Sequence, residues 1–496
     1  MKILISDQIK KADLYTIKNK KISSVDLMEN AAIACSKWIK NRYSVKYKFI
    51  FLCGNGNNGG DGLAIARNMI KDGYSSLCFE YLIKKKSSED FLINKKRLKL
   101  KTKTLNLSSI KKLILDKKHI IIDSIIGSGL NRPLDDHLKE IILWINKNAN
   151  KIISIDIPTG MFTEYNNKNK YIINADYTLT FQFPKLSFML PEAGKFVGKF
   201  KILDIGLDKN YIKEIPSSFF YNTKKSLKPF FKKYKKFDHK GSRGHLLLIA
   251  GSKGKIGASI LAGKVSLFSG LGKLTICTPK CGTEIIQTSL PEAMLEINSG
   301  KYFLSGKLNS KLKTIAIGPG IGISKSTISF VKSLIKNSSS PLILDADALN
   351  VISENKNLLD YIPENSILTP HSREFERLVG KWENDQEKLI KLKKLSLKYK
   401  IIVILKGAHT CIALPSNVFW FNSNGNPGIA TAGSGDVLTG LLGGLLAQGY
   451  KPDLCARLAV YLHGSAADLG SKKLSKETIV SGDIQKYLSI AIKKLY

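Results

Sequence analysis

Short apolar runs, separated by amphipathic stretches, recur along the whole chain. In the first half they predict strands over residues 49–53, 77–83, 119–123, 151–156, 177–181 and 200–203. Helices are predicted over residues 63–71 and 138–146, and two more, over 6–20 and 23–40, precede the first strand. Strands that are apolar throughout and alternate with helices are typical of a parallel sheet covered on both faces. We therefore expect a doubly wound α/β fold here.

The second half repeats this rhythm, with predicted strands over residues 245–250, 273–278, 314–317, 342–345, 366–369 and 401–405. Residues 411–414 and 418–421, joined by Pro415-Ser416-Asn417, predict a hairpin. Between the halves, residues 216–238 hold two prolines, two Phe-Phe pairs and many lysines, with little periodicity. We place the domain boundary in this segment, with one domain over residues 1–220 and a second over residues 225–496.

The composition is that of a cytoplasmic protein with two cores. Apolar residues make up 43% of the 496 residues, and no apolar run approaches the roughly 20 residues of a membrane span. The longest, residues 437–447, is interrupted by Thr439 and three glycines. The seven cysteines are scattered without metal-ligand spacing, which favours reduced thiols. We expect no membrane association.

The net charge of +38 raises the question of a nucleic-acid partner. Lysine greatly outnumbers arginine and is spread over nearly every predicted surface helix, instead of forming one stripe. We therefore expect at most weak, salt-sensitive and sequence-blind binding, and no specific nucleic-acid partner.

The run Gly54-Asn55-Gly56-Asn57-Asn58-Gly59-Gly60-Asp61-Gly62 follows a predicted buried strand and precedes a helix expected to start at Leu63. Five glycines release the backbone from ordinary φ/ψ limits, so successive N–H groups could converge on one anion. The helix adds the positive end of its dipole. This arrangement favours a phosphate-binding loop over a flexible surface loop.

Two further strand ends carry polar residues. One is Asp123-Ser124-Ile125-Ile126-Gly127-Ser128-Gly129-Leu130, and the other is Asp156-Ile157-Pro158-Thr159-Gly160. Ligands bind at the carboxyl ends of parallel strands, so Asn58, Asp123, Asp156 and Thr159 could converge on one site.

These three runs resemble the epimerase domain of NAD(P)H-hydrate repair proteins, over roughly residues 1–215. The resemblance implies a Rossmann-like domain that interconverts the R and S forms of hydrated NADH and NADPH. By motif, the hydrate would contact Asn57, Asn58, Gly59, Gly60, Asp61, Gly127, Ser128, Gly129, Leu130, Asn131, Arg132, Pro133 and Asp156. It also implies a potassium ion held by Asn58, Asp123 and Thr159, and hard oxygen ligands suit such a cation.

Asp156 is the candidate for proton transfer at the hydrated carbon, because a carboxylate at a strand end beside a bound nucleotide is placed for acid–base chemistry. Lys185 is a second candidate, although a phosphate contact or a solvated lysine is the more common role for such a residue.

The strongest signal of the second half is Ala432-Gly433-Ser434-Gly435-Asp436-Val437-Leu438-Thr439-Gly440. Two glycines let the backbone wrap an anion at a helix N-terminus, and Asp436 is placed to take a proton from an attacking hydroxyl. This resembles the anion hole and aspartate of ribokinase-like small-molecule kinases. The chain has no P-loop, since Gly251-Ser252-Lys253-Gly254-Lys255-Ile256-Gly257 lacks the required ending.

Four more strand ends are polar: residues 318–322, 344–350, 369–375 and 406–410. Together they are similar to the NAD(P)H-hydrate dehydratase domain, over roughly residues 225–496, and imply a ribokinase-like α/β fold. By motif, Ala258, Gly320, Gly322, His371 and Asp436 would face the hydrate, while Lys406, Gly407, Ala408, His409, Thr410 and Gly435 would face the nucleotide. The family's reaction uses ADP or ATP to phosphorylate the S hydrate, and the phosphates imply Mg²⁺.

The pairing of the two domains favours a bifunctional repair enzyme, because one domain supplies the S form and the other consumes it. A kinase of a vitamin-precursor alcohol with a nucleotide-sensing N-terminal domain is the alternative. A non-enzymatic RNA-binding scaffold is disfavoured by the intact Asn58, Asp123 and Asp156. Soluble α/β enzymes of this kind often form symmetric assemblies, so we expect a homo-oligomer.

Overall fold

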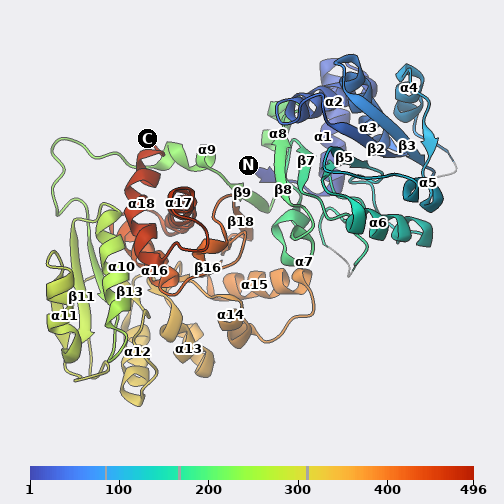
Figure 1. Ribbon diagram of the computed structural model, residues 1–496. Helices are drawn as coiled ribbons and strands as arrows, with labels where there is room; N and C mark the ends of the chain where they lie inside the picture. The colour runs from blue at the N-terminus through green and yellow to red at the C-terminus, as the bar shows by residue number, and fades with distance from the viewer. Residues whose placement is uncertain (84–85, 166–168, 309–311) are drawn as a thin grey trace. The chain divides into compact units, whose positions relative to one another are not determined.

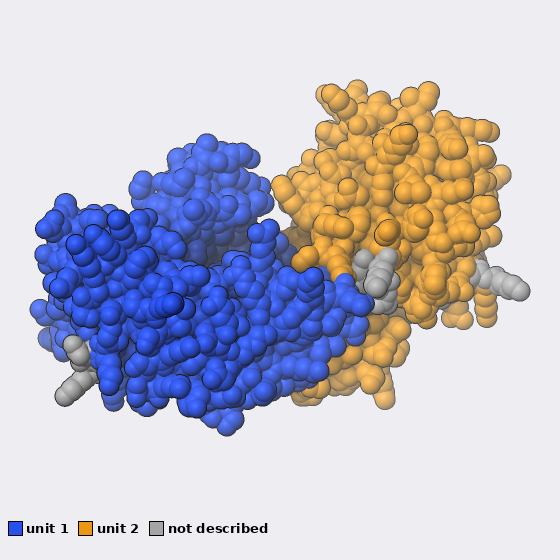
Figure 2. Space-filling model, turned by 90° about the horizontal axis from the view of Figure 1, so that it is seen from below, with its two compact units in different colours: residues 1, 218–496 blue, residues 2–217 orange. Residues whose placement is uncertain are grey.

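The computed structural model describes residues 1–83, 86–165, 169–308 and 312–496 (Figure 1). Contacts divide the chain into an N-terminal unit, residues 2–217, and a C-terminal unit, residues 218–496 together with Met1 (Figure 2). Among the described residues, no helix combines the length and apolarity needed to cross a membrane.

The N-terminal unit contains one parallel sheet with the strand order β4-β3-β2-β5-β6-β7-β8. Its strands are β2 (Lys48–Gly54), β3 (Ser75–Tyr81), β4 (Lys103–Thr104), β5 (His119–Ser124), β6 (Ile152–Ile155), β7 (Tyr177–Phe181) and β8 (Lys199–Leu203). The chain order reverses between β2 and β5, and the loops that leave such neighbouring strands open a crevice where ligands bind. The predicted doubly wound sheet is therefore confirmed, with strand boundaries shifted by one or two residues.

Alternate side chains of β2 enter two different cores. Phe49, Phe51 and Cys53 pack with one set of helices, whereas Ile50 and Leu52 pack with another. The helices are α1 (Ser6–Lys20), α2 (Ser24–Lys40), α3 (Asn57–Lys71), α4 (Glu89–Arg97), α5 (Leu107–Lys111), α6 (Asp136–Asn148), α7 (Pro191–Gly194), α8 (Lys209–Glu214) and the 3₁₀ helix η1 (Leu186–Met189). Because both faces are covered, β2 is apolar throughout.

Helix α3 begins earlier than its sequence suggests. It starts at Asn57 with Gly56 at the N-cap, so Gly59, Gly60 and Gly62 lie inside the helix and not in a loop. These glycines permit close packing: a Cβ on Gly59 would lie 1.6 Å from the Gly54 carbonyl oxygen, and one on Gly62 would lie 2.0 Å from Ser124 Oγ. The expectation of a loop up to Leu63 was wrong because helix–sheet packing outweighs the low helix propensity of glycine.

The C-terminal unit contains a second sheet with the order β9-β18-β17-β16-β15-β14-β13-β10-β11-β12. Its strands are β9 (Phe219–Asn222), β10 (His245–Ile249), β11 (Lys273–Pro279), β12 (Met294–Asn298), β13 (Thr314–Ile317), β14 (Leu342–Leu344), β15 (Ile367–Leu368), β16 (Ile402–Leu405), β17 (Cys411–Leu414) and β18 (Val418–Asn422). Strands β10 to β16 pair in parallel, and β17 and β18 form the predicted antiparallel hairpin.

Helices α10 (Ile256–Phe268), α16 (Ser434–Ala447), α17 (Pro452–Lys473) and α18 (Ser481–Lys493) share one apolar core with strands of this sheet. The remaining helices of the unit are α9 (Lys224–Leu227), α11 (Thr283–Ser289), α12 (Lys325–Asn337), α13 (Ala346–Glu354), α14 (Ser372–Val379), α15 (Asp385–Tyr399) and the 3₁₀ helices η2 (Lys228–Phe230), η3 (Lys280–Gly282), η4 (Lys356–Tyr361) and η5 (Pro427–Ile429). This packing fixes the first turn of α16 beside the ends of the parallel strands.

The segment expected to separate the domains is partly structured. Strand β9 lies within it and pairs in parallel with β18, where Phe220 stacks on Trp420 with 4.6 Å between the ring centroids. The compact units divide between Ser217 and Ser218, ahead of this strand. Strands β9 and β12 carry no clear sequence signal, because β9 lies among prolines and lysines and β12 follows a proline with a mixed pattern.

Candidate active sites

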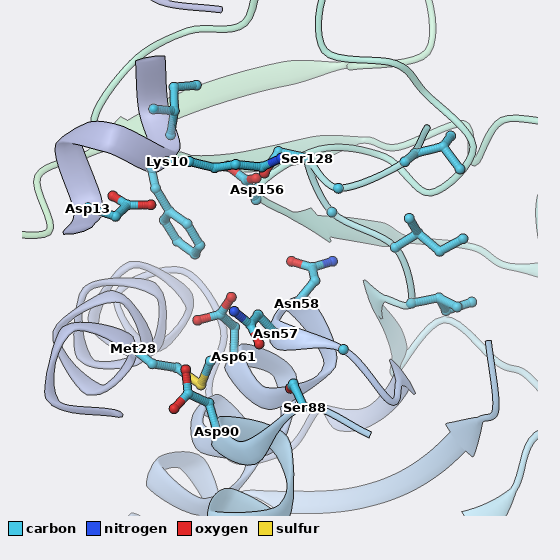
Figure 3. Close-up of a pocket in the computed structure, with 18 of the residues that line it drawn as sticks. Lys10, Asp13, Met28, Asn57, Asn58, Asp61, Ser88, Asp90, Ser128 and Asp156 are labelled. Atoms are coloured by element: carbon cyan, nitrogen blue, oxygen red, sulfur yellow. The ribbon is translucent and has the colours of Figure 1, made fainter. Parts of the chain in front are cut away.

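A cavity of about 1060 Å³ lies in the N-terminal unit (Figure 3). It is lined by the start of α3, the loop after β5, the loop after β6 and one side of α1. Every residue predicted to contact the hydrate in this unit lines it, except Gly59 and Gly60. Those two glycines are buried in helix–sheet and helix–helix contacts, so they fix the position of α3 without lining the cavity themselves.

The first turn of α3 presents its free end to this cavity. Asn57 and Asn58 are the first helical residues, and both line the cavity. The first N–H groups of a helix have no partner within the helix, and the dipole adds positive charge there. The backbone N–H groups expected in a glycine loop therefore belong to the first turn of a helix, and anion binding there stays a prediction.

Asp156 forms a buried ion pair with Lys185. Its Oδ1 lies 2.8 Å from Lys185 Nζ, and the side chains are 9% and 1% exposed. Asp156 follows β6 with φ of 64°, a left-handed conformation that is strained for a residue with a side chain and that clusters at functional sites. Lys185 is thus not a solvated lysine: it neutralises the carboxylate at the cavity wall.

Asp123 and Thr159 are in direct contact in the interior. Thr159 Oγ1 and N donate to the two Asp123 oxygens at 2.5 and 2.9 Å, and Ser154 Oγ donates at 2.7 Å. Burial raises the pKa of Asp123, and these hydrogen bonds offset only part of that effect. Among the described residues, no cation pairs with Asp123.

Asn58 lies against the same loop. In the amide orientation that satisfies both neighbours, its Nδ2 donates to the Ile155 carbonyl at 3.2 Å and its Oδ1 accepts from Gly127 N at 3.3 Å. The residue before Gly127, Ile126, donates its N–H to Thr159 Oγ1 at 3.0 Å. Asn58 and Thr159 thus both contact the loop that follows β5, and Thr159 also contacts Asp123 near the end of that strand.

Besides Asp156, the carboxyl groups of Asp13, Asp61, Asp90 and Asp135 line the cavity, and of these four only Asp61 was predicted from the sequence. Burial and the charges of Asp156 and Asp13 raise the pKa of Asp61 well above its usual range. Burial and Asp156 raise the pKa of Asp13 to about 7, while Lys185 opposes the shift. A sequence signal for Asp13 exists, because it falls on the same face of α1 as Ile9 and Ile17, four residues to either side.

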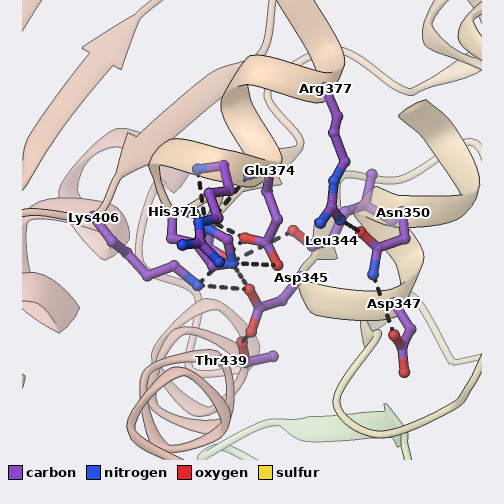
Figure 4. A network of polar contacts seen from close by, with 11 residues as sticks. Leu344, Asp345, Asp347, Asn350, His371, Glu374, Arg377, Lys406 and Thr439 are labelled. Carbon is purple, nitrogen blue, oxygen red and sulfur yellow. Dashed lines mark hydrogen bonds and ion pairs between the residues drawn. The ribbon is translucent and has the colours of Figure 1, made fainter. Parts of the chain in front are cut away.

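In the C-terminal unit, Asp345 joins the ends of three strands to α16 (Figure 4). Its Oδ1 accepts from Thr369 Oγ1 at 2.6 Å and lies 3.1 Å from Lys406 Nζ, and its Oδ2 accepts from Thr439 Oγ1 at 2.7 Å. Burial lowers the pKa of Lys406, but Asp345 and Glu374 outweigh it and leave a net rise. Lys406 is therefore a fixed positive charge at this edge of the sheet.

Asp436 lies in the first turn of α16, a 14-residue helix whose N-cap, Gly433, has φ of 83°. A Cβ on Gly435 would lie 3.5 Å from Lys406 Nζ and 3.6 Å from Asp345 Oδ2, so the helix N-terminus faces the lysine. Burial, followed by the charge of Asp345, raises the pKa of Asp436 to about 6, with Lys406 acting in the opposite direction. A group with this pKa can accept a proton at neutral pH.

His371 is the N-cap of α14. Its Nδ1 accepts from the N–H groups of Arg373 and Glu374 at 3.1 and 3.3 Å, while Glu374 Oε2 accepts from His371 N at 2.8 Å. The neutral ring therefore carries its proton on Nε2. Glu374 also lies 4.0 Å from Lys406 Nζ, which connects His371 to the Asp345 network.

The remaining predicted residues fall into two groups. Ala258 and Gly320 are adjacent, and Gly322 N donates to Asp347 Oδ2 at 2.8 Å, with Lys255 Nζ 3.5 Å from the same oxygen. Residues 407–410 form a turn after β16, in which His409 Nδ1 lies 2.9 Å from the Asn422 carbonyl oxygen. The predicted hydrate-facing and nucleotide-facing residues thus all follow parallel strands or begin α10 and α16. Three carboxylates without an assigned role contact these residues. Asp345 lies beside Lys406, Asp347 accepts from Gly322 N, and Glu374 accepts from His371 N.

Comparisons with known proteins cover both units. A family model described as NAD(P)H-hydrate dehydratase matches residues 246–489, and one described as YjeF-related protein N-terminus matches residues 24–187. Bifunctional NAD(P)H-hydrate repair enzymes match the chain end to end. The protein from Dictyoglomus turgidum is 31% identical over 100% of this chain and 99% of its own, and that from Moorella thermoacetica is 30% identical over 96% and 93%.

Among solved structures, ADP/ATP-dependent NAD(P)H-hydrate dehydratase from Bacillus subtilis, co-crystallised with ATP and Mg²⁺, matches with a TM-score of 0.50 at 31% identity. It covers 56% of this chain and 99% of its own. A ribokinase-like superfamily protein from Enterococcus faecalis matches with a TM-score of 0.50 at 27% identity, which agrees with the expected fold of the second half. Taken over its whole length, the chain belongs to the family of bifunctional NAD(P)H-hydrate repair enzymes, with an epimerase domain followed by a dehydratase domain.

Proposed function

We propose that the two sites described above carry the two steps of NAD(P)H-hydrate repair. The cavity of the N-terminal unit interconverts the R and S hydrates of NADH and NADPH. The site around Asp436 dehydrates the S hydrate with ADP or ATP as the phosphoryl donor. The family assignment supports the pair of activities, and the site geometry supports the roles of individual residues.

In the epimerase site, Asp156 exchanges a proton with the oxygen on the hydrated carbon. The support is its place at the cavity wall, where it forms a buried ion pair with Lys185. The first turn of α3 and the loop of residues 127–133 hold the nucleotide part, since free N–H groups and the helix dipole favour phosphate.

A monovalent cation fits the interior next to this site. Asp123 is fully buried, receives hydrogen bonds from neutral donors and has no cationic partner within the described ranges. An ion such as K⁺, held by oxygens of Asn58, Asp123 and Thr159, would balance its charge. Bound there, it would also fix the loops after β5 and β6 that form the cavity wall.

In the dehydratase site, Asp436 takes the proton of the hydrate hydroxyl as that oxygen attacks the terminal phosphorus of the nucleotide. Lys406 and the N–H groups at the start of α16 stabilise the charge of the transferring group. Loss of the phosphate ester then restores the double bond. Mg²⁺ would be held mainly by the nucleotide phosphates, because the described residues contain no group of three carboxylate, imidazole or thiolate ligands arranged for a metal.

The observation that carries the proposal is that Lys406 Nζ faces the start of α16, the helix turn that holds Asp436, so a base and a positive charge lie beside one helix N-terminus. The test is to incubate purified S hydrate with ADP or ATP and Mg²⁺. Rising absorbance of reduced nicotinamide supports repair. A phosphorylated alcohol that accumulates would instead support the kinase alternative, which the comparisons do not favour.

The partners follow from the same proposal. The substrates are hydrated NADH and NADPH and a nucleotide, in a homo-oligomer of the cytoplasm without a specific nucleic-acid partner. The seven cysteines are all free, which agrees with a reducing compartment.

A further inference from the structure

Epimerisation places a particular demand on the N-terminal cavity. This inference rests on the epimerase activity proposed above. The R and S hydrates carry the hydroxyl on opposite faces of the ring, at the carbon next to the ring nitrogen. If water leaves from one face and returns to the other, each face needs a group that can give and take a proton. Asp156 supplies one such group.

Asp13 meets the requirement for the second. It lies on α1, which forms one wall of the cavity, whereas Asp156 projects from the loop after β6 (Figure 3). Ile9 and Ile17, one turn before and one turn after, line the same wall. Within the described residues Asp13 makes no hydrogen bond and no ion pair, and its half-buried side chain lines the cavity. A carboxyl group that lines a cavity without a protein partner is free to contact a ligand there.

The charges around the cavity favour a carboxyl group that gains and loses a proton near neutral pH. The carboxyl groups of Asp13, Asp61 and Asp156 line one cavity in which, among the described residues, Lys185 is the one buried cation. The other charged groups that line the cavity in the described ranges are Lys10, Lys86, Asp90, Arg132 and Asp135. Burial and Asp156 raise the pKa of Asp13 to about 7, so near neutral pH the group is present in both protonation states. That is the condition under which one residue serves as acid in one direction and as base in the other.

We propose that Asp13 is a second catalytic acid–base residue of the epimerase site, and that it acts on the ring face opposite to the one served by Asp156. In one direction, the carboxylic acid of Asp13 protonates the hydroxyl. The C–O bond breaks with its electron pair on the oxygen, water leaves, and the ring nitrogen shares its lone pair with the carbon. A water on the other face then forms a new C–O bond and passes its proton to Asp156. The reverse reaction exchanges the two roles, and no electrons are gained or lost overall.

Asp61 has a different task. It is 9% exposed, lies in α3 and, among the described residues, forms no ion pair with a basic side chain. Burial and the nearby carboxylates raise the pKa of Asp61 well above its usual range, which favours the protonated form over the carboxylate that a base requires. In the protonated form it would donate a hydrogen bond to the hydrate.

The experiment uses the full chain and purified R or S NADH hydrate in H₂¹⁸O, without ADP or ATP so that dehydration does not occur. Chromatography follows epimerisation, and mass spectrometry follows ¹⁸O entering each epimer. The wild-type chain should interconvert the epimers and label both. Asp13→Asn should slow epimerisation by about 10²-fold or more yet still label one epimer, while Asp156→Asn should label only the other.

Asp7→Asn is the matched control, because it makes the same change on the same helix at a side chain that is 80% exposed and outside the cavity. It should epimerise like the wild type. The midpoint temperature of thermal unfolding should not be lower for Asp13→Asn than for the wild type, because the substitution removes no hydrogen bond or ion pair among the described residues. Epimerisation by Asp13→Asn within a few-fold of wild type, or equal loss of labelling in both epimers, would overturn the assignment, as would wild-type epimerisation without label. A wild-type chain that does not interconvert the epimers would instead refute the proposed function itself.

Discussion

At the scale of single residues, Asp436 governs the predicted pH dependence of dehydration. Its folded-state pKa is raised from 3.8 to about 6 by burial and by Asp345. A base must be deprotonated to act, so kcat/KM for the S hydrate should fall as the pH drops below about 6. A rate profile from pH 4.5 to 8 checks this, and a profile that stays flat down to pH 4.5 would contradict it.

Asp345 offers a second test at this scale. Asp345→Asn keeps the shape of the side chain but removes a negative charge that raises the pKa of Asp436. The acidic limb of the dehydration profile should therefore move to lower pH. Lys406 also loses its ion-pair partner, so KM for the nucleotide should rise.

The control for Asp345 is Asp360→Asn, an exposed aspartate in the same unit, which should leave both quantities unchanged. If the acidic limb of the pH–rate profile does not move in Asp345→Asn, while circular dichroism shows a normal fold, Asp345 has only a structural role.

Several site residues could be predicted from the sequence because each lies at the end of a strand or directly after one. Asp123 is near the end of β5, while Asp156, Asp345 and Lys406 follow their strands, and a parallel sheet brings such positions to one edge. For Lys185 and Asp13 the signals in the sequence are weaker: Lys185 is a candidate by its place after Phe183-Pro184, and Asp13 shares a helix face with Ile9 and Ile17. Which groups they lie beside depends on how a 3₁₀ helix and an N-terminal helix pack, and the sequence pattern does not encode that packing.

At the scale of elements, the start of α3 is the feature that sequence reasoning placed wrongly and that the structure explains by packing. Gly59→Ala should destabilise the N-terminal unit by about 1–3 kcal/mol, because the new Cβ meets the Gly54 backbone and neither side can retreat. Thermal unfolding followed by circular dichroism should show the midpoint temperature of the N-terminal unit lowered by roughly 2–4 °C for each kcal/mol.

Gly56→Ser is the control for that substitution. A Cβ at Gly56 meets nothing within 4 Å, and serine is a favoured N-cap residue, so stability should be preserved. Equal unfolding temperatures for Gly59→Ala and the parent would mean that the helix does not pack on β2 as described.

Most strands were predicted within two residues, because runs buried on both faces are apolar and unambiguous. Strand β9 was missed for the opposite reason: its four residues lie between a proline and a lysine pair, and only pairing with β18 makes them a strand. Tertiary contact decides such short elements.

At the scale of the whole molecule, β9 decides where the chain can be divided. Residues 218–496 expressed alone should dehydrate the S hydrate, whereas residues 224–496 should unfold at lower temperature, because β18 loses its parallel partner and Phe219 no longer stacks on Phe419. Calorimetry of the two fragments measures the difference. Equal unfolding temperatures would place β9 outside the cooperative unit.

The central claim is that two independent sites, one in each unit, each depend on one carboxyl group. The most direct measurement mixes full-length Asp156→Asn with full-length Asp436→Asn and adds racemic NADH hydrate, ATP or ADP, and Mg²⁺. Asp156→Asn alone should restore only the S half of the hydrate promptly, and Asp436→Asn alone should dehydrate about 10²- to 10⁴-fold more slowly than the parent. The mixture should return all of the hydrate to NADH, because the S form made by one protein diffuses to the other. Complete repair at the parental rate by either variant alone, or a mixture that stops at half conversion, would contradict the account.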